Sequence, residues 1–197
     1  PVEALPAIAS ALRGLTPTEV TVVALLVASA ALSAAGAPVG SGVLVAGDVP
    51  GVHAKAMTHA SAKWAHVARA LPPDHHLLRL SYGGRGARDA DLQRGRPTPP
   101  HADDGTATDE ALVRRALADA SALLGEEVGP LVLRGAGVTT WRHGLVRPVV
   151  GRRAALDAID DALAALPDLA LLGGAVAGNG LLGVVARSRM EAARTLT

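Results

Sequence analysis

The chain has 197 residues, of which 49% are hydrophobic and 19% are charged, and its formal net charge is +1. This composition is typical of a folded globular protein, and the nearly balanced charge does not indicate a nucleic-acid-binding surface. The absence of cysteine excludes disulfides, thiolate metal sites and cysteine nucleophiles, and the absence of phenylalanine indicates an aliphatic core.

The first part of the chain predicts one helix and a sheet. Apolar residues at helical spacing, followed by Gly14, predict a helix over residues 6–14. Runs rich in β-branched and aliphatic residues, separated by turn residues, predict strands. These strands cover residues 20–27, 42–46, 52–58 and 76–82.

The uncharged stretch over residues 20–47 has the length of a membrane span. Glycines and a proline interrupt its second half, however, and such residues favour a loop. We therefore expect a buried strand followed by a loop, and no transmembrane helix. The expected location is the cytoplasm, with at most peripheral contact with a membrane.

The second part of the chain predicts mainly helices. Residues from about 83 to 107 lack apolar periodicity and predict an exposed loop. Thr108 is a suitable N-cap and Gly125 a suitable stop for the helix that follows. The remaining elements are a strand over 131–138, a helix over 152–166, a strand over 169–172, a glycine loop over 173–180 and a helix over 181–196.

The last of these turns contains the pattern G-x-G-x-x-G, at Gly178, Gly180 and Gly183. Glycines allow close approach of a ligand, and the amide end of the following helix suits a phosphate or the electron-rich edge of a flavin. The acidic residue that a dinucleotide site needs about 20 positions later does not occur. A tight turn in which glycine only permits packing is the alternative interpretation.

Other chemistries are not indicated. The chain has seven histidines, but no H-x-x-x-H pair with a carboxylate partner falls on a predicted helix, so we expect no metal site. The serines do not lie in a G-x-S-x-G motif, so a hydrolase is not indicated.

Five segments in order resemble the protoporphyrinogen/coproporphyrinogen oxidase family of the flavin amine oxidase superfamily. They are the glycine-serine-glycine strand at 40–45, the threonine and serine segment ending in lysine-tryptophan at 55–66, the leucine-leucine-arginine strand at 77–81, the valine-threonine-threonine-tryptophan stretch at 138–141 and the turn and helix at 171–187. The resemblance covers essentially the whole chain. The segment 142–152, Gly183 and Arg189 depart from the family pattern.

The resemblance implies an α+β and α/β fold taken from a larger two-lobed flavoenzyme. Residues 1–135 would form mainly a substrate-binding lobe built around a mixed sheet, and residues 136–197 the C-terminal part of a Rossmann-like FAD-binding lobe. The chain begins with Pro1 rather than methionine. We therefore expect a C-terminal portion whose partner is a missing N-terminal FAD-binding segment.

The resemblance also implies a set of site residues. Trp141 would lie against the isoalloxazine of FAD. Arg79 is a candidate for the propionate carboxylates of the substrate, although a solvated surface arginine is the alternative interpretation. No catalytic residue is nominated. The residues expected at the flavin's pyrimidine edge are Asn179, Gly180, Leu181 and Leu182, with Gly173 and Gly174 leading the chain into the site.

The implied activity is FAD-dependent oxidation of coproporphyrinogen III or protoporphyrinogen IX, with dioxygen as acceptor, in haem biosynthesis. The flavin carries the difficult step, so an obvious acid–base pair is not required. The alternatives are another flavin amine oxidase or desaturase with a different hydrophobic substrate, and a catalytically silent fragment or interaction module.

Overall fold

The computed structural model describes residues 4–15, 17–34, 40–46, 49–83, 108–146 and 150–195. The chain divides into two compact units. One unit is Val20–Trp141, and the other combines Pro1–Glu19 with Arg142–Thr197. We call the first the sheet unit and the second the helical unit, and describe each by itself.

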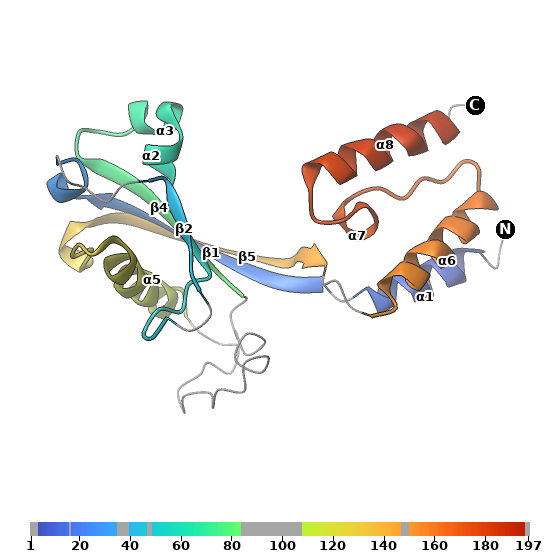
Figure 1. The fold of residues 1–197 in the computed structure, drawn as a ribbon, viewed down its shortest axis with the longest axis horizontal. Helices are drawn as coiled ribbons and strands as arrows, with labels where there is room; N and C mark the ends of the chain where they lie inside the picture. The colour runs from blue at the N-terminus through green and yellow to red at the C-terminus, as the bar shows by residue number, and fades with distance from the viewer. Residues whose placement is uncertain are drawn as a thin grey trace. The chain divides into compact units, whose positions relative to one another are not determined.

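The sheet unit is built on five strands in the order β2-β3-β4-β1-β5. The β1–β4, β2–β3 and β3–β4 pairs are antiparallel, and Figure 1 shows β5 beside β1, running in the opposite direction. The α+β fold class is confirmed, with a sheet that is antiparallel rather than mixed. The strands are β1 (Pro17–Ala28), β2 (Gly42–Leu44), β3 (Ala56–His59), β4 (His75–Tyr82) and β5 (Leu133–Val146).

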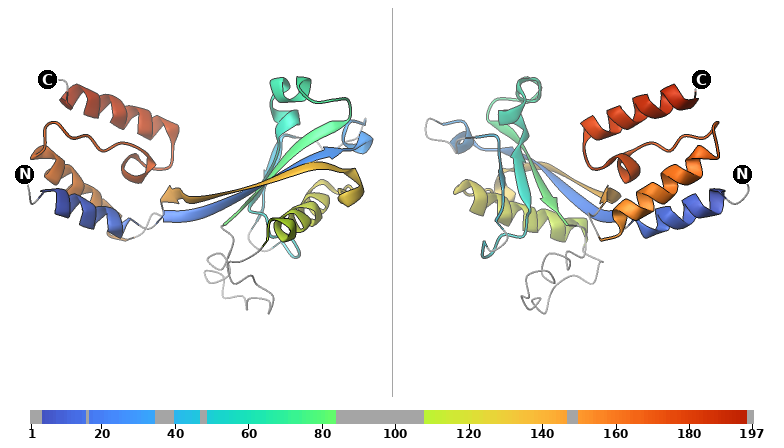
Figure 2. Two further views of the ribbon diagram at one scale, coloured as in Figure 1. Left: turned by 180° about the vertical axis from the view of Figure 1, so that it is seen from behind. Right: turned by 45° about the vertical axis from the view of Figure 1, so that its right-hand side comes forward.

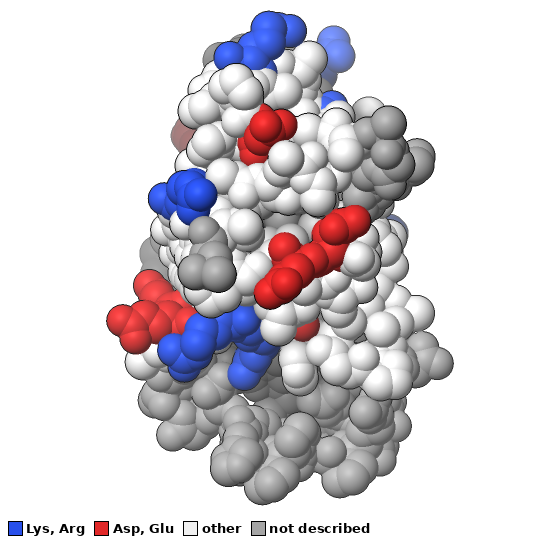
Figure 3. All heavy atoms as spheres, turned by 90° about the vertical axis from the view of Figure 1, so that its left-hand side faces the viewer, with Lys and Arg blue, Asp and Glu red and all other residues white. Residues whose placement is uncertain are grey.

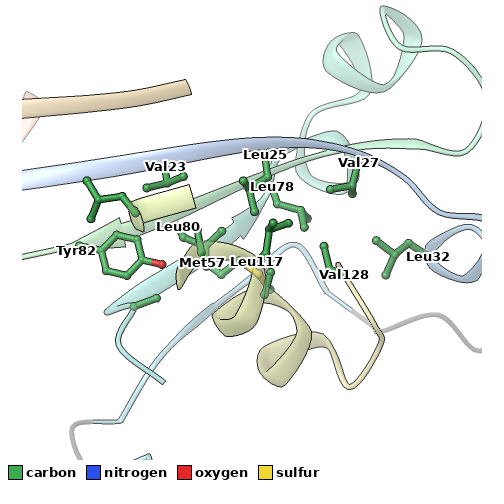
Figure 4. Close-up of a cluster of buried hydrophobic side chains, with 14 residues drawn as sticks. Val23, Leu25, Val27, Leu32, Met57, Leu78, Leu80, Tyr82, Leu117 and Val128 are labelled. Atoms are coloured by element: carbon green, nitrogen blue, oxygen red, sulfur yellow. The ribbon is translucent and has the colours of Figure 1, made fainter. Parts of the chain in front are cut away.

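One face of this sheet carries the core. Alternate residues of β1, namely Val23, Leu25 and Val27, are buried, as are Leu78 and Leu80 of β4. Alternation arises because successive side chains of a strand point to opposite faces. The helix α5 (Asp109–Leu124) covers this face, and Figure 4 shows its side chains meeting those of the strands.

The ends of α5 follow the sequence prediction. The hydroxyl of Thr108 accepts a hydrogen bond of 3.2 Å from the backbone N–H of Ala111. Gly125 ends the helix in the left-handed conformation, with φ of 67°. Short helices complete the sheet unit: η1 (Ala30–Leu32), α2 (Ala60–Lys63), α3 (Ala65–Arg69) and η2 (Pro130–Val132).

The return strand that we expected over residues 52–58 begins only at Ala56. The reason is a competing partner for its backbone. The amides of His53 and Ala54 donate to the buried carboxylate of Asp119, at 3.1 and 2.8 Å. A strand needs those amides for its ladder, so the segment is held against α5 instead.

The helical unit contains α1 (Ala4–Gly14), α6 (Arg152–Ala164), α7 (Gly174–Ala177) and α8 (Leu181–Thr195). Figures 1 and 2 show α1 and α6 side by side. Their contact buries Ile8, Ile159 and Leu163, and Val176 of α7 joins the same cluster. The predicted apolar stripe of the helix over 152–166 is thereby confirmed.

The strand that we expected over residues 169–172 is not formed. The carbonyl of Leu169 instead accepts a hydrogen bond from the guanidinium of Arg194, so a side chain takes the place of a neighbouring strand. The glycine loop over 173–180 contains the short helix α7. The predicted exposed loop, except for Gly83, lies outside the described residues.

The compact units also divide the chain differently from the lobes named in the sequence analysis. The predicted boundary lies between residues 135 and 136, whereas the division between the compact units falls between Trp141 and Arg142 in the sequence. The first 19 residues group with the C-terminal part because α1 packs on α6. The functional assignment of each lobe stays a prediction.

Candidate functional site

The predicted site residues fall into both units. Trp141 and Arg79 belong to the sheet unit, and the residues from Gly173 to Leu182 belong to the helical unit. We describe each set within its own unit.

The glycine turn before α8 has two positions that require glycine by conformation. Gly173, which precedes α7, has φ of 104°, and Gly178, which follows it, has φ of 93°. A side chain at either position would be strained. Val176, which lies between these two glycines, is buried in the helical core and holds the turn in place.

Gly183 has a packing role. A Cβ built at this residue would lie 2.6 Å from the carbonyl oxygen of Ala177, which is backbone and cannot move aside easily. The third glycine of the G-x-G-x-x-G pattern thus permits the close approach of α7 and α8. This finding agrees with the packing interpretation of that one glycine.

The other glycines of the turn leave open space beside the backbone. A Cβ at Gly173, Gly174, Gly178 or Gly180 would meet no atom within 4 Å. Gly180, Leu181 and Leu182 are exposed at the start of α8, a helix of 15 residues. The amide end of such a helix carries a partial positive charge and suits an electron-rich ligand.

The side chain of Asn179 is already occupied. Its amide nitrogen donates to the carbonyl of Val146 at 2.8 Å, and its oxygen accepts from the N–H of Val146 at 3.0 Å. This pairing fastens the turn to the end of β5. Sequence reasoning assigned Asn179 only a backbone role and missed this contact, because its partner lies 33 residues away.

The inward side of α8 is charged. Glu191 is buried and forms ion pairs with Arg187 at 3.2 Å and with Arg194 at 2.9 Å. Arg187 also pairs with Asp160 of α6 at 2.6 Å, and this hydrogen bond raises the pKa of the Arg187 guanidinium. Ion pairs therefore stabilise the side of α8 that faces the rest of the helical unit.

The outward side of α8 is mostly apolar, with the exposed Arg189 among the apolar residues, whereas a surface helix usually exposes mainly polar side chains. Leu182 is 85% exposed and Met190 is 59% exposed. Leu181 and Val185 are exposed on the same helix. We call these four residues the outer face of α8. Exposed apolar side chains that gather on one helix mark a surface suited to contact with another surface.

The two site candidates of the sheet unit lie on strands. Trp141 is on β5 and is 58% exposed, so its ring is accessible. Arg79 is exposed on β4, where it is opposite Ala24 of β1 and Thr58 of β3. Trp141 and Arg79 are the two predicted site residues of the sheet unit, and they do not contact each other.

The sheet unit also has a cavity of about 490 Å³ between α5 and β5. Its lining is mostly apolar, with charged side chains from the first turns of α5. None of the predicted site residues lines it. The lining residues that carry its character are Val113, Leu117, Leu133, Val138, Asp109 and Arg114.

Three further observations concern surface charge, metal ligands and membrane spans. The face in Figure 3 shows separate acidic and basic patches rather than a surface of one sign. No group of three or more potential metal ligands occurs among the described residues. No helix in the described part of the chain has both the length and the apolar character needed to cross a bilayer.

The chain matches no protein-family model and no curated protein by sequence. Among solved structures it is similar to a "putative protoporphyrinogen oxidase" from Exiguobacterium, with a TM-score of 0.64 and 24% identity over 93% of this chain and 36% of that chain. It is also similar to a reduced UDP-galactopyranose mutase, with a TM-score of 0.54 and 14% identity over 83% of this chain and 28% of that chain.

These likenesses establish the fold. The chain spans about a third of the length of the solved structures that it matches. Both matches cover most of this chain, so each includes residues of both units.

Proposed function

We propose that this chain is part of an FAD-dependent oxidoreductase and that the turn between α7 and α8 binds the pyrimidine edge of the flavin. The observation that carries the proposal is the exposed amide end of α8 beside glycines with open space around them. The fold likeness to a putative protoporphyrinogen oxidase supports it.

The residues of the turn fit such a group. Gly180, Leu181 and Leu182 would offer backbone groups at the helix start, and Gly173 and Gly174 place no side chain beside them, where even an added Cβ would meet no atom within 4 Å. Asn179 would contribute only its backbone, because its side chain binds Val146. When bound, the flavin would supply the capacity to accept a hydride.

The remaining tasks fall to this chain. Trp141 has an accessible ring on β5, and the resemblance is the support for its proposed contact with the flavin. Arg79 has an exposed guanidinium on a rigid strand, which suits a planar carboxylate of the substrate. The expected task of the protein is to hold two ring systems together rather than to transfer protons.

The proposed substrate is a porphyrinogen, either coproporphyrinogen III or protoporphyrinogen IX, with dioxygen as the acceptor. The support is the resemblance of five segments together with the named structural neighbour. The mutase shares the fold, so the fold by itself serves more than one substrate.

The proposed partner is the polypeptide that completes the FAD-binding lobe. The solved neighbours have about two thirds of their length outside the matched part. The outer face of α8, which includes Leu182 and Met190, would be covered by that polypeptide. Such a partner would account for the exposed apolar side chains of α8.

The test of the substrate is an oxidation assay on the full product of the gene, supplied with FAD and with each porphyrinogen in turn. Porphyrin fluorescence should appear, with consumption of dioxygen. Arg79→Gln should raise KM at least about tenfold, since a hydrogen bond to a charged group contributes about 1.5–3 kcal/mol. Arg69→Gln, at an exposed position on α3, is the matched control and should leave KM unchanged.

Turnover of an amine or of another reduced hydrophobic compound, without porphyrin formation, would reject the porphyrinogen and keep the flavoenzyme. A folded gene product that binds no FAD and oxidises none of these compounds would contradict the whole proposal.

A further inference from the structure

Two histidines form a hydrogen-bonded chain at one end of the sheet unit. The Nε2 atom of His59, at the end of β3, is 3.0 Å from the Nδ1 atom of His76 on β4. The Nε2 atom of His76 is 3.1 Å from the hydroxyl of Ser33, just after η1. The chain therefore connects three segments that are far apart in the sequence.

Other polar links at the same end include the β3–β4 and β1–β4 ladders and the bond from the N–H of Ser29 to the carbonyl of Asp74 at 2.8 Å. The backbone N–H of His59 donates to the carbonyl of Ser41 at 3.0 Å. The hydroxyl of Ser61, on α2, accepts from the N–H of Leu77 at 3.2 Å. Both bonds start within two residues of the histidine pair, so a change in the pair would be transmitted to them.

The two rings are poorly placed to carry charge. His59 is only 7% exposed, and His76 is partly buried. Burial lowers the pKa of both side chains, and the neighbouring ring of His76 lowers the pKa of His59 further. Burial disfavours the charged form of a histidine because it removes the solvent around the cation.

Charged groups nearby act on His76 in opposite directions. After burial, a hydrogen bond with the backbone of Ser29 and the carboxylate of Asp74 raise the pKa of His76, and His75 lowers it. The element α2, which packs on β4, carries the cation Lys63. Burial is the largest influence, so the net direction for His76 is downward.

The hydrogen bond between the rings limits how many protons the pair can hold. One ring nitrogen must donate and the other must accept, and a neutral imidazole has one of each. If both rings are protonated, each of these nitrogens becomes a donor. Two positive charges would then face each other across 3.0 Å in a partly buried site.

We propose that the His59–His76 pair is an acid-sensitive clasp, which reinforces the β3–β4 ladder and links it to Ser33 beside η1 at neutral pH, and which opens when a second proton enters the pair. This inference does not depend on the proposed flavin chemistry. The proton comes from solvent, and no other reactant is needed.

The sign of the effect follows from the lowered pKa values. The unfolded chain binds protons at these histidines near pH 6.5, whereas the folded chain binds them only at lower pH. Stability from the clasp is therefore complete above about pH 6.5 and is lost as pH falls below it. For each pKa unit between the two states, the opening equilibrium shifts about tenfold.

The test combines ring titration with backbone exchange on the intact chain. NMR titration should show both rings protonating below pH 6.5. Amide hydrogen exchange at His59 and Leu77, corrected for intrinsic rate, should increase at least about tenfold between pH 7 and pH 5. Exchange at Tyr82, near the other end of β4, should change much less.

Variants separate the clasp from general acid effects. The double variant His59→Gln/His76→Gln should lose the pH dependence of exchange at Leu77. His66→Gln, at an exposed position on α3, is the matched control and should keep it. If the double variant does not fold, the wild-type titration decides alone. Rings that titrate at or above pH 6.5, or exchange at Leu77 that does not respond to pH, would overturn the proposal.

Discussion

The side-chain amide of Asn179 binds both backbone groups of Val146, donating at 2.8 Å and accepting at 3.0 Å. Asn179 opens the turn that leads into α8, and Val146 ends β5. The candidate flavin-binding turn is thus held to a strand end by one side chain, which the sequence motif does not reveal.

Asn179→Ala should remove both bonds and loosen the turn. Because each hydrogen bond contributes about 0.5–1.5 kcal/mol, we expect a loss of about 1–3 kcal/mol of unfolding free energy, measured by urea denaturation. Ser10→Ala, at an exposed position on α1, is the control and should change the free energy by less than about 0.5 kcal/mol. Equal effects of the two substitutions would contradict a role for the Asn179–Val146 pair.

The buried carboxylate of Asp119 is the second contact open to test. It accepts from the amides of His53 and Ala54 and from the hydroxyl of Tyr82, the last at 3.0 Å. Burial and this carboxylate raise the pKa of the Tyr82 phenol, which keeps the donor protonated. Asp119→Ala leaves these buried donors unsatisfied and should destabilise the sheet unit by about 3–5 kcal/mol.

Tyr82→Phe should cost less than Asp119→Ala, about 1–2 kcal/mol, because two of the three bonds to the carboxylate remain. Thermal unfolding followed by circular dichroism measures both. A larger loss for Tyr82→Phe than for Asp119→Ala would show that the carboxylate does not organise this region.

We expect the buried carboxylate of Glu191 to stabilise the helical unit. Glu191→Ala removes the partner that Arg187 and Arg194 share, while Asp160 and the carbonyl of Leu169 remain, so it should cost about 1–3 kcal/mol. Asp157→Ala removes an ion pair with Arg153 that is exposed on both sides, and it should cost less than about 0.5 kcal/mol. Similar losses for the two variants would contradict the inward orientation of the charged side of α8.

The outer face of α8 should tolerate charge. Leu182→Lys and Met190→Lys place a cation in solvent, so we expect unchanged unfolding free energy and weaker binding of a hydrophobic dye such as ANS. Leu163→Lys, which buries the charge in the helical core, should unfold the unit. Strong destabilisation by Leu182→Lys would mean that this face is covered by residues of the same chain.

Local signals in the sequence were sufficient for several elements. The bounds of α5 follow from Thr108 and Gly125, because a cap acts on amides within a few residues of itself. The stripe containing Ile159 and Leu163 follows from helical spacing alone. The glycine turn before α8 was also predicted, since its residues are contiguous.

Contacts between distant residues account for the differences. The return strand does not begin at residue 52 as expected, because the amides of His53 and Ala54 donate to Asp119 instead. Asp119 lies at least 65 residues further along the sequence. The expected strand at 169–172 fails because Arg194 binds the carbonyl of Leu169. Neither partner can be assigned from spacing, because each depends on how a helix packs against a distant non-helical segment.

Backbone NMR of the labelled full gene product during titration with FAD tests the central claim most directly. The account predicts that the amides of Gly180, Leu181 and Leu182 shift most. Gly180→Val, which fills open space without backbone strain, should weaken the apparent affinity for FAD at least about tenfold, which corresponds to about 1.4 kcal/mol. Gly14→Val, a matched glycine of α1 with open space, should leave this affinity unchanged. Shifts confined to other residues, or no shifts at millimolar FAD in a folded chain, would contradict the assignment of this turn to a flavin.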